Sequence, residues 1–578
     1  MRFHGERDSW SSPGLAAALF VAVFHACSVS DKDDFAFGGE ASAGGASDGG
    51  AAGAGGEPAE PPPSASGAGG EGEGAGGSPS SGGAAGARDA DGGADPSLGG
   101  AAGSDGSAGA SGAAGSDACP DDYEEDVTGA CRPLLRALEV WPASRAAVEL
   151  VEELEPQFSQ AEREYTIQTS FWATEVAVAP SGAAGSSVTV DGTPIEDGEE
   201  AVVPLELGSN TVEIVVSDGA AATDYRLVVH RREPIRIPYP VTGARFGNAV
   251  VASGDFLVVG APGATRLVAF ERTGPGIWED IGEIAGGPGF GTSLAYDGTT
   301  LAVGAPNEPM GADDYIGALH LFRQTGSEFE EEQRTVMSVP SAVRLLGTSV
   351  AVSGRSAAAT TDNYDELHTY SRNASGVWSE DPGSFLAAPP GGVFIEGVVA
   401  LDGDWLAVGD HNGSTSAPDG IRQASVFLYT RRAPGDAWAP PASGSARLTA
   451  SGLFADGVAL RDRTLVANGE PVRVFEREDD GTWSNRPLPC DSLGPVVVTE
   501  TALVVGSPQN AYNGVTGDTV RVFRREGPGA MFQEDPSSPV PPLSGASEEF
   551  GFAVAAEGYR VFVGAPSDGN GGAVYIYD

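Results

Sequence analysis

The stretch Phe550–Asp578 has the sequence FGFAVAAEGYRVFVGAPSDGNGGAVYIYD. Its alternation of apolar and polar residues predicts three short strands, Gly551–Ala555, Arg560–Gly564 and Ala573–Tyr577. A tight Glu557-Gly558 turn and a loop rich in Gly, Asp and Asn connect them. A three-stranded meander cannot bury both of its faces alone, so this stretch is expected to be one repeat of an array.

The same pattern recurs upstream, and seven copies can be counted. The copies of the predicted second strand are Leu257–Pro262, Leu301–Pro306, Val350–Ser353, Leu406–Gly409, Leu465–Asn468, Leu503–Pro508 and Val561–Pro566. The copies of the third strand are Leu267–Arg272, Leu319–Arg323, Leu367–Arg372, Val426–Arg431, Val472–Arg477, Val520–Arg525 and Val574–Tyr577. An aromatic residue then opens a fourth strand at Trp278, Phe329, Trp378, Trp438, Trp483 and Phe532. Four strands at a period of roughly 38 to 59 residues are typical of a β-propeller blade.

The repeats also resemble a known family. Phe246-Gly247, Phe290-Gly291 and Phe550-Gly551 are each followed by an Ala/Val strand and then by Gly-Ala-Pro. This resembles the FG-GAP repeat of the integrin α-subunit propeller and of many bacterial surface proteins, and it implies an all-β, seven-bladed propeller over residues 233–578. The motif is degenerate in the third to fifth repeats. The family's calcium sites are not carried over, because hairpins such as Asp297-Gly298 are too short to wrap an ion that takes about 6 to 8 oxygen ligands.

The segment Glu233–Pro240 predicts one more strand just before the first repeat. The last repeat ends after its third strand, and a propeller needs its ring closed. We therefore expect Ile235–Tyr239 to pair with Ala573–Tyr577 as the outer strand of the last blade. The alternative is that Glu233–Pro240 is a bare interdomain linker.

The N-terminus indicates export. Arg2 and Arg7 precede an apolar run, Leu15–Ala26, which is too short for a membrane span and suits a signal-peptide core. The residues before Cys27 resemble a bacterial lipobox, so residues 1–27 are interpreted as a lipoprotein signal with Cys27 as the lipidation site. An ordinary signal peptide or a misplaced start codon are the alternatives. Residues 28–117 consist mainly of Gly, Ala, Ser, Pro and acidic residues, which predicts a disordered tether.

Two further segments precede the repeats. Cys119 and Cys131 are expected to form a disulfide that closes the loop 118–133, since an exported chain favours disulfides and the spacing fits no common zinc site. The acidic residues of this loop could bind Ca²⁺, but they lack the order of a calcium-ligand loop. Residues 134–232 contain seven alternating stretches, which predict a β-sandwich. The expected strands are Ala146–Val151, Glu164–Gln168, Glu175–Ala179, Ser187–Val190, Ala201–Leu205, Thr211–Val216 and Thr223–His230. Phe158, Tyr165, Val190-Asp-Gly192 and Tyr225–Val229 resemble the bacterial cadherin-like β-sandwich domain.

The sequence offers little catalytic chemistry. The Gly-x-Ser-x-Gly spacing occurs at Gly45–Gly49, inside the Gly/Ala/Ser-rich tether and away from any predicted strand. No phosphate loop or His-Glu-x-x-His motif occurs among the 578 residues, and no cofactor or metal is indicated. The formal net charge of -48 makes nucleic acid a poor partner. The expected function is non-catalytic recognition or adhesion by a cell-surface or secreted protein that binds a protein or a glycan. It would be held in the cell envelope, anchored at the outer membrane, or be released. A propeller enzyme acting on polysaccharide and a purely structural envelope protein are the alternatives.

The ligand site is expected on the long loops between second and third strands, because length without secondary structure is tolerated mainly where loops bind something. The four loops are Asn307–Gly317, Gly354–Asp365, Asp410–Gln423 and Gln509–Asp518. Their candidate ligand-binding residues are Asp313, Asp314, Tyr315, Asp362, Asn363, Tyr364, Asp410, His411, Asn412, Asn510, Tyr512 and Asn513. Solvated loops of drifted repeats are the alternative.

Overall fold

The computed structural model is all-β. It describes residues 119–143, 152–309, 316–336, 345–361, 366–383, 397–410, 424–441, 446–508, 519–540, 542–543 and 549–578. These residues form strands and one short 3₁₀ turn, η2 (Pro262–Ala264). Within these ranges no helix is long and apolar enough to cross a membrane. The signal segment, Cys27 and the predicted tether lie outside the described residues.

A small hairpin and a sandwich come first. The hairpin pairs β1 (Tyr123–Glu125) with β2 (Cys131–Pro133). One sheet of the sandwich has the order β3-β5-β8, and the other has the order β4-β10-β9-β6-β7. Their bounds are β3 Leu135–Pro142, β4 Glu164–Thr169, β5 Glu175–Gly182, β6 Ser187–Val190, β7 Thr193–Ile195, β8 Ala201–Pro204, β9 Gly208–Ser217 and β10 Ala222–Arg231. Buried and exposed residues alternate along β4 and β10, which places Tyr165 and Leu227 in the core between the sheets.

The sandwich therefore agrees with the sequence in most strands. The expected strand Ala146–Val151 lies outside the described residues, and β3 and β7 were not expected. β4 runs parallel to β10, with Tyr165 opposite Leu227, whereas β9 runs antiparallel to β10. The two outward-facing sides carry the polar residues, as the alternation predicted.

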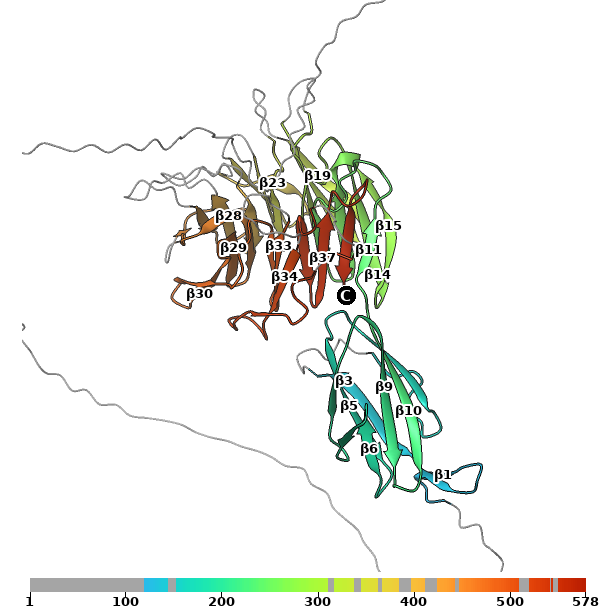
Figure 1. The fold of residues 1–578 in the computed structure, drawn as a ribbon. Coiled ribbons are helices and arrows are strands. Elements are labelled where there is room, and N and C mark those ends of the chain that lie inside the picture. Colours follow the sequence, from blue (N-terminus) through green and yellow to red (C-terminus); the bar gives the residue numbers. More distant parts are fainter. Residues whose placement is uncertain are drawn as a thin grey trace, which may run out of the picture. The chain divides into compact units, whose positions relative to one another are not determined.

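Seven four-stranded sheets follow among the described residues (Figure 1), and we number them sheet 1 to sheet 7 in chain order. Sheet 1 consists of β12 Val250–Ser253, β13 Phe256–Ala261, β14 Arg266–Gly274 and β15 Ile277–Ala285. Sheet 2 consists of β16 Ser293–Tyr296, β17 Thr300–Ala305, β18 Ala318–Thr325 and β19 Glu328–Val336. Sheet 3 consists of β20 Val350–Ser353, β21 Ser356–Thr360, β22 Leu367–Arg372 and β23 Trp378–Glu380. Sheet 4 consists of β24 Val399–Asp402, β25 Trp405–Asp410, β26 Ser425–Thr430 and β27 Arg447–Leu448. Sheet 5 consists of β28 Leu453–Arg461, β29 Thr464–Gly469, β30 Arg473–Arg477 and β31 Trp483–Pro487. Sheet 6 consists of β32 Val496–Val498, β33 Ala502–Ser507, β34 Thr519–Arg524 and β35 Gln533–Glu534. Sheet 7 consists of β36 Ala553–Glu557, β37 Arg560–Ala565, β38 Ala573–Tyr577 and β11 Ile235–Pro238.

The Phe-Gly and Gly-Ala-Pro motifs meet where neighbouring sheets touch. The N–H of Gly247 donates to the Gly260 carbonyl of its own sheet at 3.1 Å. A Cβ built on Gly564 of sheet 7 would lie 2.0 Å from the Gly247 carbonyl oxygen, and one on Gly260 would lie 2.2 Å from that of Gly291. Since real Cβ atoms do not approach an oxygen so closely, any side chain at Gly260 or Gly564 would push adjacent sheets apart. The repeated glycines are thus a requirement of sheet packing.

Contacts between the sheets follow the chain. The first strand of each sheet contacts the first strand of the next, and β36 of sheet 7 contacts β12 of sheet 1. The predicted pairing of the early strand with the last one is confirmed. β11 pairs antiparallel with β38, with Ile235 opposite Ile576 and Pro238 opposite Ala573. In Figure 1 the green β11 accordingly lies beside the red strands of sheet 7.

Two assignments from the sequence were wrong. Val350–Ser353 is the first strand of sheet 3 and not its second, because the second strand is β21, whose Ser-Ala-Ala-Ala-Thr sequence lacks the large apolar residues of its counterparts. The expected long loop Gly354–Asp365 therefore contains a strand and is shorter than expected. Trp438 does not open the fourth strand of sheet 4, which begins at Arg447; Thr430 and Ala439 form only an isolated bridge.

The turn after β4 touches sheet 7. The N–H of Phe171 donates to the Asp578 carbonyl at 2.9 Å, and the Trp172 Nε1–H donates to the Tyr577 carbonyl at 3.2 Å. Both rings are buried in the same apolar cluster as Tyr575 and Tyr577. Residues 118–578 accordingly belong to one compact unit.

Candidate functional site

An arginine lies within two residues of the end of the third strand in six of the seven repeats, near the turn that joins the first and second strands. The backbone N–H of Arg431 donates to the Asp404 carbonyl at 3.2 Å, and that of Arg477 donates to the Arg463 carbonyl at 2.8 Å. We call this edge of the sheets the hairpin face. The six residues are Arg272, Arg323, Arg372, Arg431, Arg477 and Arg525.

Four of these arginines reach a carboxylate of the preceding sheet, counting sheet 7 as preceding sheet 1. The pairs are Arg372 with Glu332, Arg431 with Asp381 at 2.8 Å, Arg525 with Glu476 at 3.0 Å and Arg272 with Asp578 at 3.5 Å. These ion pairs join adjacent sheets, and we refer to them as inter-sheet pairs. Most of the side chains involved are buried or half-buried, which strengthens the attraction relative to an exposed pair.

Arg477 is an exception. Its guanidinium carbon lies 4.4 Å from the ring centroid of Trp405 in sheet 4, and it has no carboxylate within ion-pair distance in the described part of the chain. The cause is visible in the sequence. Glu332 and Asp381 each lie three residues after the aromatic residue of their repeat, and Pro441 holds that position after Trp438. Sheet 4 thus presents an indole and a proline where other sheets present an acid.

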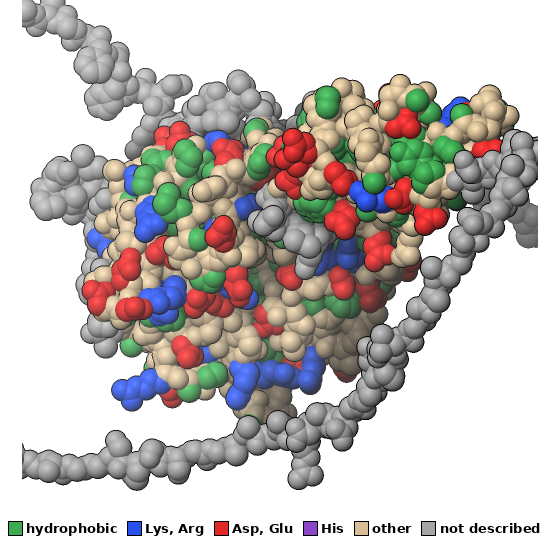
Figure 2. All heavy atoms as spheres, turned by 90° about the horizontal axis from the view of Figure 1, so that it is seen from below, with side chains coloured by type: hydrophobic (Ala, Val, Ile, Leu, Met, Phe, Trp, Pro, Cys, Tyr) green, Lys and Arg blue, Asp and Glu red, His purple; other side chains and the backbone are tan. Residues whose placement is uncertain are grey.

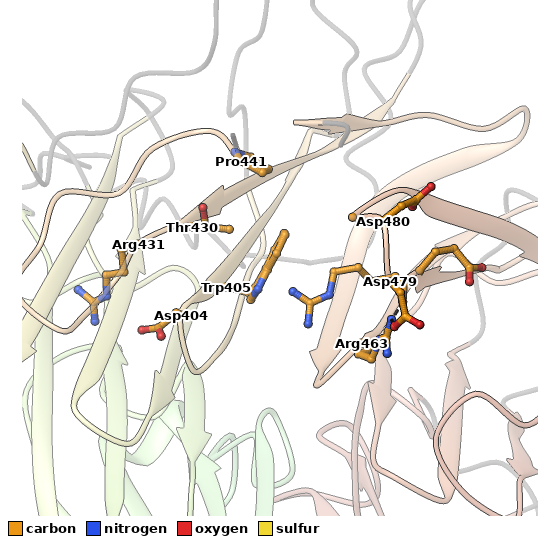
Figure 3. A pocket seen from close by; sticks show the side chains of 11 residues that line it. Asp404, Trp405, Thr430, Arg431, Pro441, Arg463, Asp479 and Asp480 are labelled. Carbon is orange, nitrogen blue, oxygen red and sulfur yellow. Dashed lines mark hydrogen bonds and ion pairs between the residues drawn. The ribbon is translucent and has the colours of Figure 1, made fainter. Parts of the chain in front are cut away.

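A cleft of about 450 Å³ opens at this place (Figure 3). Asp404, Trp405, Thr430, Arg431 and Pro441 line it from sheet 4 and the chain that follows. The remaining lining residues come from sheet 5 and its third turn, and they are Arg463, Arg477, Glu478, Asp479, Asp480 and Gly481. The half-buried Trp405 is held from the side by Trp483, whose ring lies 5.8 Å away in an edge-to-face arrangement.

Arg463 and Arg477, the two arginines that sheet 5 contributes to the cleft, differ in the direction of their pKa shifts. Arg463 is bound to Asp479 at 2.7 Å, and this hydrogen bond raises the pKa of the Arg463 guanidinium. Burial lowers the pKa of Arg477, and repulsion from Arg463 lowers it further. Hydrogen bonds from Thr482 lower the pKa of Asp480, so this carboxylate is ionised at neutral pH. Arg477 is therefore a partly buried cation that has no carboxylate at ion-pair distance among the described residues.

A second cleft of about 420 Å³ lies at the equivalent place between sheets 2 and 3. Arg323, Arg355 and Arg372 line it together with the turn Asn373–Gly376. Two of its arginines have more polar partners than Arg477 has in the first cleft. Arg372 binds Glu332 and the Gly376 carbonyl, and Arg355 Nε donates to the Arg372 carbonyl at 2.7 Å. None of its described lining residues is aromatic.

Acidic and basic side chains are interspersed on the surface that Figure 2 shows from below. Among the described residues every Lys or Arg side chain is an arginine, because the chain's single lysine is Lys32. The net charge of -48 thus coexists with local arginine sites that can receive an anion.

The loop residues expected to bind a ligand are mostly outside the described residues. Asp410 alone is described. It is the last residue of β25, pairs with Ser425 in β26 and is fully buried. The other eleven, Asp313, Asp314, Tyr315, Asp362, Asn363, Tyr364, His411, Asn412, Asn510, Tyr512 and Asn513, remain a prediction.

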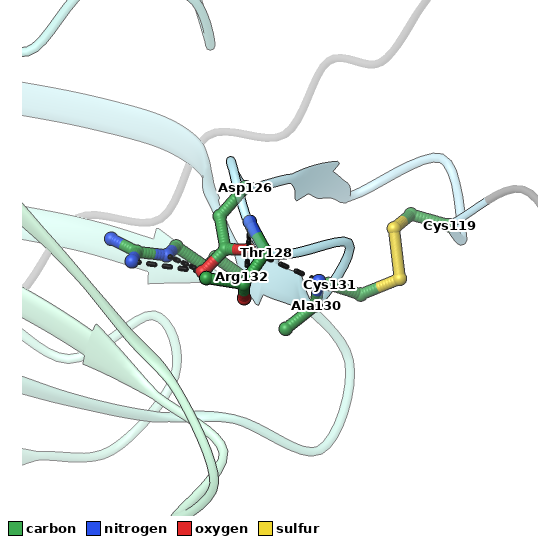
Figure 4. The surroundings of a disulfide bond; sticks show 6 residues. All are labelled: Cys119, Asp126, Thr128, Ala130, Cys131 and Arg132. Atoms are coloured by element: carbon green, nitrogen blue, oxygen red, sulfur yellow. Dashed lines mark hydrogen bonds and ion pairs between the residues drawn. A yellow bond between two sulfur atoms is a disulfide. The ribbon is translucent and has the colours of Figure 1, made fainter.

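The disulfide between Cys119 and Cys131 is confirmed (Figure 4). In its loop the Asp126 carboxylate accepts hydrogen bonds from the Thr128 hydroxyl and backbone and from the Ala130 N–H, and it binds Arg132 at 2.9 Å. These contacts hold the pKa of Asp126 well below its usual range, the Thr128 hydroxyl contributing most. The carboxylate stabilises the turn. Across the described ranges no group of three or more His, Cys, Asp or Glu side chains is placed to hold a metal ion.

Two histidines at equivalent positions of β18 and β22 contact carboxylates. His320 lies 2.8 Å from Glu308 through Nε2 and 2.8 Å from Glu331 through Nδ1. His368 lies 3.1 Å from Glu380. Both histidines are buried in their sheets, so these contacts connect strands within the protein.

Comparison with known proteins identifies one part of the chain. Residues 141–232 match the model of the cadherin-like beta sandwich domain. This cadherin-like domain coincides with β4 to β10 and most of the sandwich described above, and the resemblance expected from Phe158, Tyr165 and Tyr225 is confirmed. No curated protein matches the chain.

Solved structures with a similar fold are distant. A streptogramin B lyase has 9% identity and a TM-score of 0.37, with 60% of this chain and 97% of that chain covered. A β-propeller domain from Myceliophteria thermophila has 14% identity and a TM-score of 0.36, covering 60% and 100%. A periplasmic gluconolactonase from Pseudomonas aeruginosa has 15% identity and a TM-score of 0.32, covering 56% and 92%. These values say nothing about what the chain binds or catalyses.

Proposed function

We propose that this chain is an exported, non-catalytic recognition protein that binds a glycan or protein ligand in the cleft between sheets 4 and 5. In this proposal the seven sheets form a closed, seven-bladed propeller of the FG-GAP type. The glycine contacts between neighbouring sheets, the contact of β36 with β12 and the pairing of β11 with β38 support this architecture.

One observation carries the assignment of the site. Arg477 stacks on Trp405 in a cleft of about 450 Å³ and lacks the carboxylate that partners its counterparts between other sheets. A partly buried guanidinium without an ionic partner can form a charge-assisted hydrogen bond with an anionic group of a ligand. An aromatic wall beside polar groups is also a common feature of ligand sites.

The chain's placement in the cell is part of the proposal. Residues 1–27 would direct export, Cys27 would carry the lipid, and residues 28–117 would act as the tether. The protein would lie in the cell envelope, anchored at the outer membrane, or be secreted. The cadherin-like domain would act as a spacer between the tether and the propeller.

The test compares the two faces of the propeller. The purified full chain is applied to glycan and protein arrays, and each hit is measured again with two folded variants. Trp405→Ala removes the aromatic wall of the cleft, whereas the triple change Tyr315→Ala, Tyr364→Ala and Tyr512→Ala removes the tyrosines of the opposite loops. We expect the Trp405 variant to lose affinity and the triple variant to retain it.

The reverse result would place the ligand on the loops and overturn the cleft as the site. Conversion of an array ligand into a product would overturn the non-catalytic assignment. Circular dichroism of each variant shows whether the loss of affinity comes from unfolding, since Trp405 also contacts Trp483.

A further inference from the structure

The inter-sheet pairs show what the cleft between sheets 4 and 5 lacks. At three other junctions of consecutive sheets a carboxylate of one sheet meets the third-strand arginine of the next, as Asp381 meets Arg431. At the junction of sheets 4 and 5 the arginine is present, and Pro441 takes the sequence position of the acid and lines a cleft of about 450 Å³. The cleft therefore has the size and the cation for a carboxylate that comes from outside the chain.

We propose that the cleft binds the carboxylate of an acidic sugar, with Arg477 as its main donor. This inference rests on the proposed function and names the ligand class of that same site. A guanidinium that stacks on an indole through its face keeps its N–H edge free, and this edge can donate two parallel hydrogen bonds to a carboxylate. The Arg477 guanidinium carbon lies 4.4 Å from the Trp405 ring centroid, so the indole contacts the guanidinium and adds apolar surface to the cleft.

The remaining lining groups select for hydroxyls on the same ligand. Asp404, Glu478 and Asp480 provide carboxylate acceptors, Thr430 adds a hydroxyl, and none of these acids forms an ion pair with Arg477. Sugar hydroxyls donate to such acceptors. A monosaccharide unit with one carboxylate and several hydroxyls therefore complements both kinds of group.

The same acids act against other anions. Some anions would bring several negative charges toward Asp404, Glu478 and Asp480, and these like charges would repel one another. Such anions are a phosphate or sulfate of greater charge, a nucleic acid backbone and an anionic membrane. A single carboxylate approaches from the Arg477 side and avoids most of this repulsion. Phosphate and nucleic acid are accordingly expected not to bind.

Titration calorimetry with the full chain tests the inference. The probe is methyl galactopyranosiduronic acid, a monosaccharide with one carboxylate, and its matched neutral probes are the methyl ester of the same monosaccharide and methyl galactopyranoside. We expect the acidic probe to bind and both neutral probes to bind about 10- to 100-fold more weakly, which is the usual effect of losing a charge-assisted hydrogen bond. This comparison needs no change in the protein.

Variants then locate the carboxylate. Arg477→Gln should weaken the acidic probe by about the same 10- to 100-fold and leave the neutral probes unchanged, while Arg477→Lys should give an intermediate loss because lysine lacks the fork. Arg226→Gln, an exposed arginine of the sandwich, is the matched control and should bind like wild type.

Three outcomes would overturn the inference: no binding of the acidic probe, equal binding of the acidic and neutral probes, or acidic binding that Arg477→Gln does not alter. These results leave the proposed function separately testable. A neutral glycan or a protein that binds wild type and loses affinity in Trp405→Ala would uphold the cleft as the site while rejecting the acidic sugar.

Discussion

Arg431 Nη1 lies 2.8 Å from Asp381 Oδ2, and the two side chains are 0% and 1% exposed. This pair connects sheets 3 and 4, and Arg431 also donates to the Ser371 hydroxyl at 2.9 Å. Burial lowers the pKa of Arg431, and the attraction of Asp381 opposes this effect. The pair is therefore the most enclosed of the inter-sheet pairs.

Removal of one partner is expected to be strongly destabilising. Asp381→Ala leaves the Arg431 charge buried and uncompensated, which costs about 3–5 kcal/mol of unfolding free energy. The double variant Asp381→Leu with Arg431→Met removes both charges and should recover much of that loss. Chemical denaturation of the three proteins measures the difference. Equal stability of Asp381→Ala and wild type would show that the pair does not hold the sheets together.

The pairing of β11 with β38 predicts that the early strand stabilises the last sheet. Deletion of Glu233–Pro240 removes the backbone hydrogen bonds of this pairing and the Arg236–Asp568 contact at 2.9 Å. At about 1 kcal/mol for each hydrogen bond, several kcal/mol should be lost. A Gly-Ser segment of the same length is the matched control for chain connection, and it should be destabilised as well. Melting of either variant at the wild-type temperature would contradict the role of β11.

Asp568 gives a prediction for the pH dependence of stability. Burial, the largest single influence, raises the pKa of Asp568, but the hydrogen bonds from Arg236 and Tyr575 and the Arg236 charge together lower it below the ordinary value of 3.8. A carboxyl group with a lowered folded pKa contributes stability above its unfolded pKa and loses that contribution as the pH falls through the folded pKa. The stability difference between wild type and Arg236→Gln should therefore be constant at neutral pH and shrink below about pH 4.

Urea denaturation between pH 3 and pH 7 measures this difference. Arg226→Gln, whose ion pair with Glu164 is long at 4.0 Å and exposed, should follow wild type over the same range. A difference between wild type and Arg236→Gln that stays the same down to pH 3 would show that the Asp568 carboxylate gains nothing from Arg236.

Lipidation of Cys27 is the fourth prediction. The apolar run Leu15–Ala26 and the lipobox-like residues before Cys27 motivate it. Mass spectrometry of the native protein should find a diacylglycerol-modified Cys27 at the mature N-terminus, and Cys27→Ser should move the protein from the membrane fraction to the soluble fraction. An unmodified N-terminus at another residue, or unchanged fractionation of the variant, would reject lipidation.

The sequence predicted the repeated sheets because their motifs reflect contacts made in every repeat. Gly260 and Gly564 recur since any side chain there would meet the next sheet's backbone. Sheet 3 was misread because the small residues of β21 carry little apolar signal, while Val350–Ser353 in β20 has the pattern of a second strand. All five residues of β21 are buried although their side chains are small.

The cleft could not be predicted in the same way. It depends on what two sheets present to each other, and the Trp405–Arg477 contact joins residues from different repeats. One signal was available: Pro441 stands three residues after Trp438, where Phe329 and Trp378 are followed by acids. The expectation of a loop site used loop length alone, which carries no information about which arginines lack a partner.

The pairing of β11 with β38 also implies a delay between the synthesis of the two strands. Arg236 and Asp568 are 332 residues apart in sequence, and the ribosome adds about 5 to 20 residues per second. The early strand must therefore wait about 15 to 70 seconds for its partner to be made. During that interval β11 has an unpaired edge, a feature that promotes association with other chains. If the chain is exported, as proposed above, a carrier that keeps the nascent chain unfolded until translocation would remove this hazard.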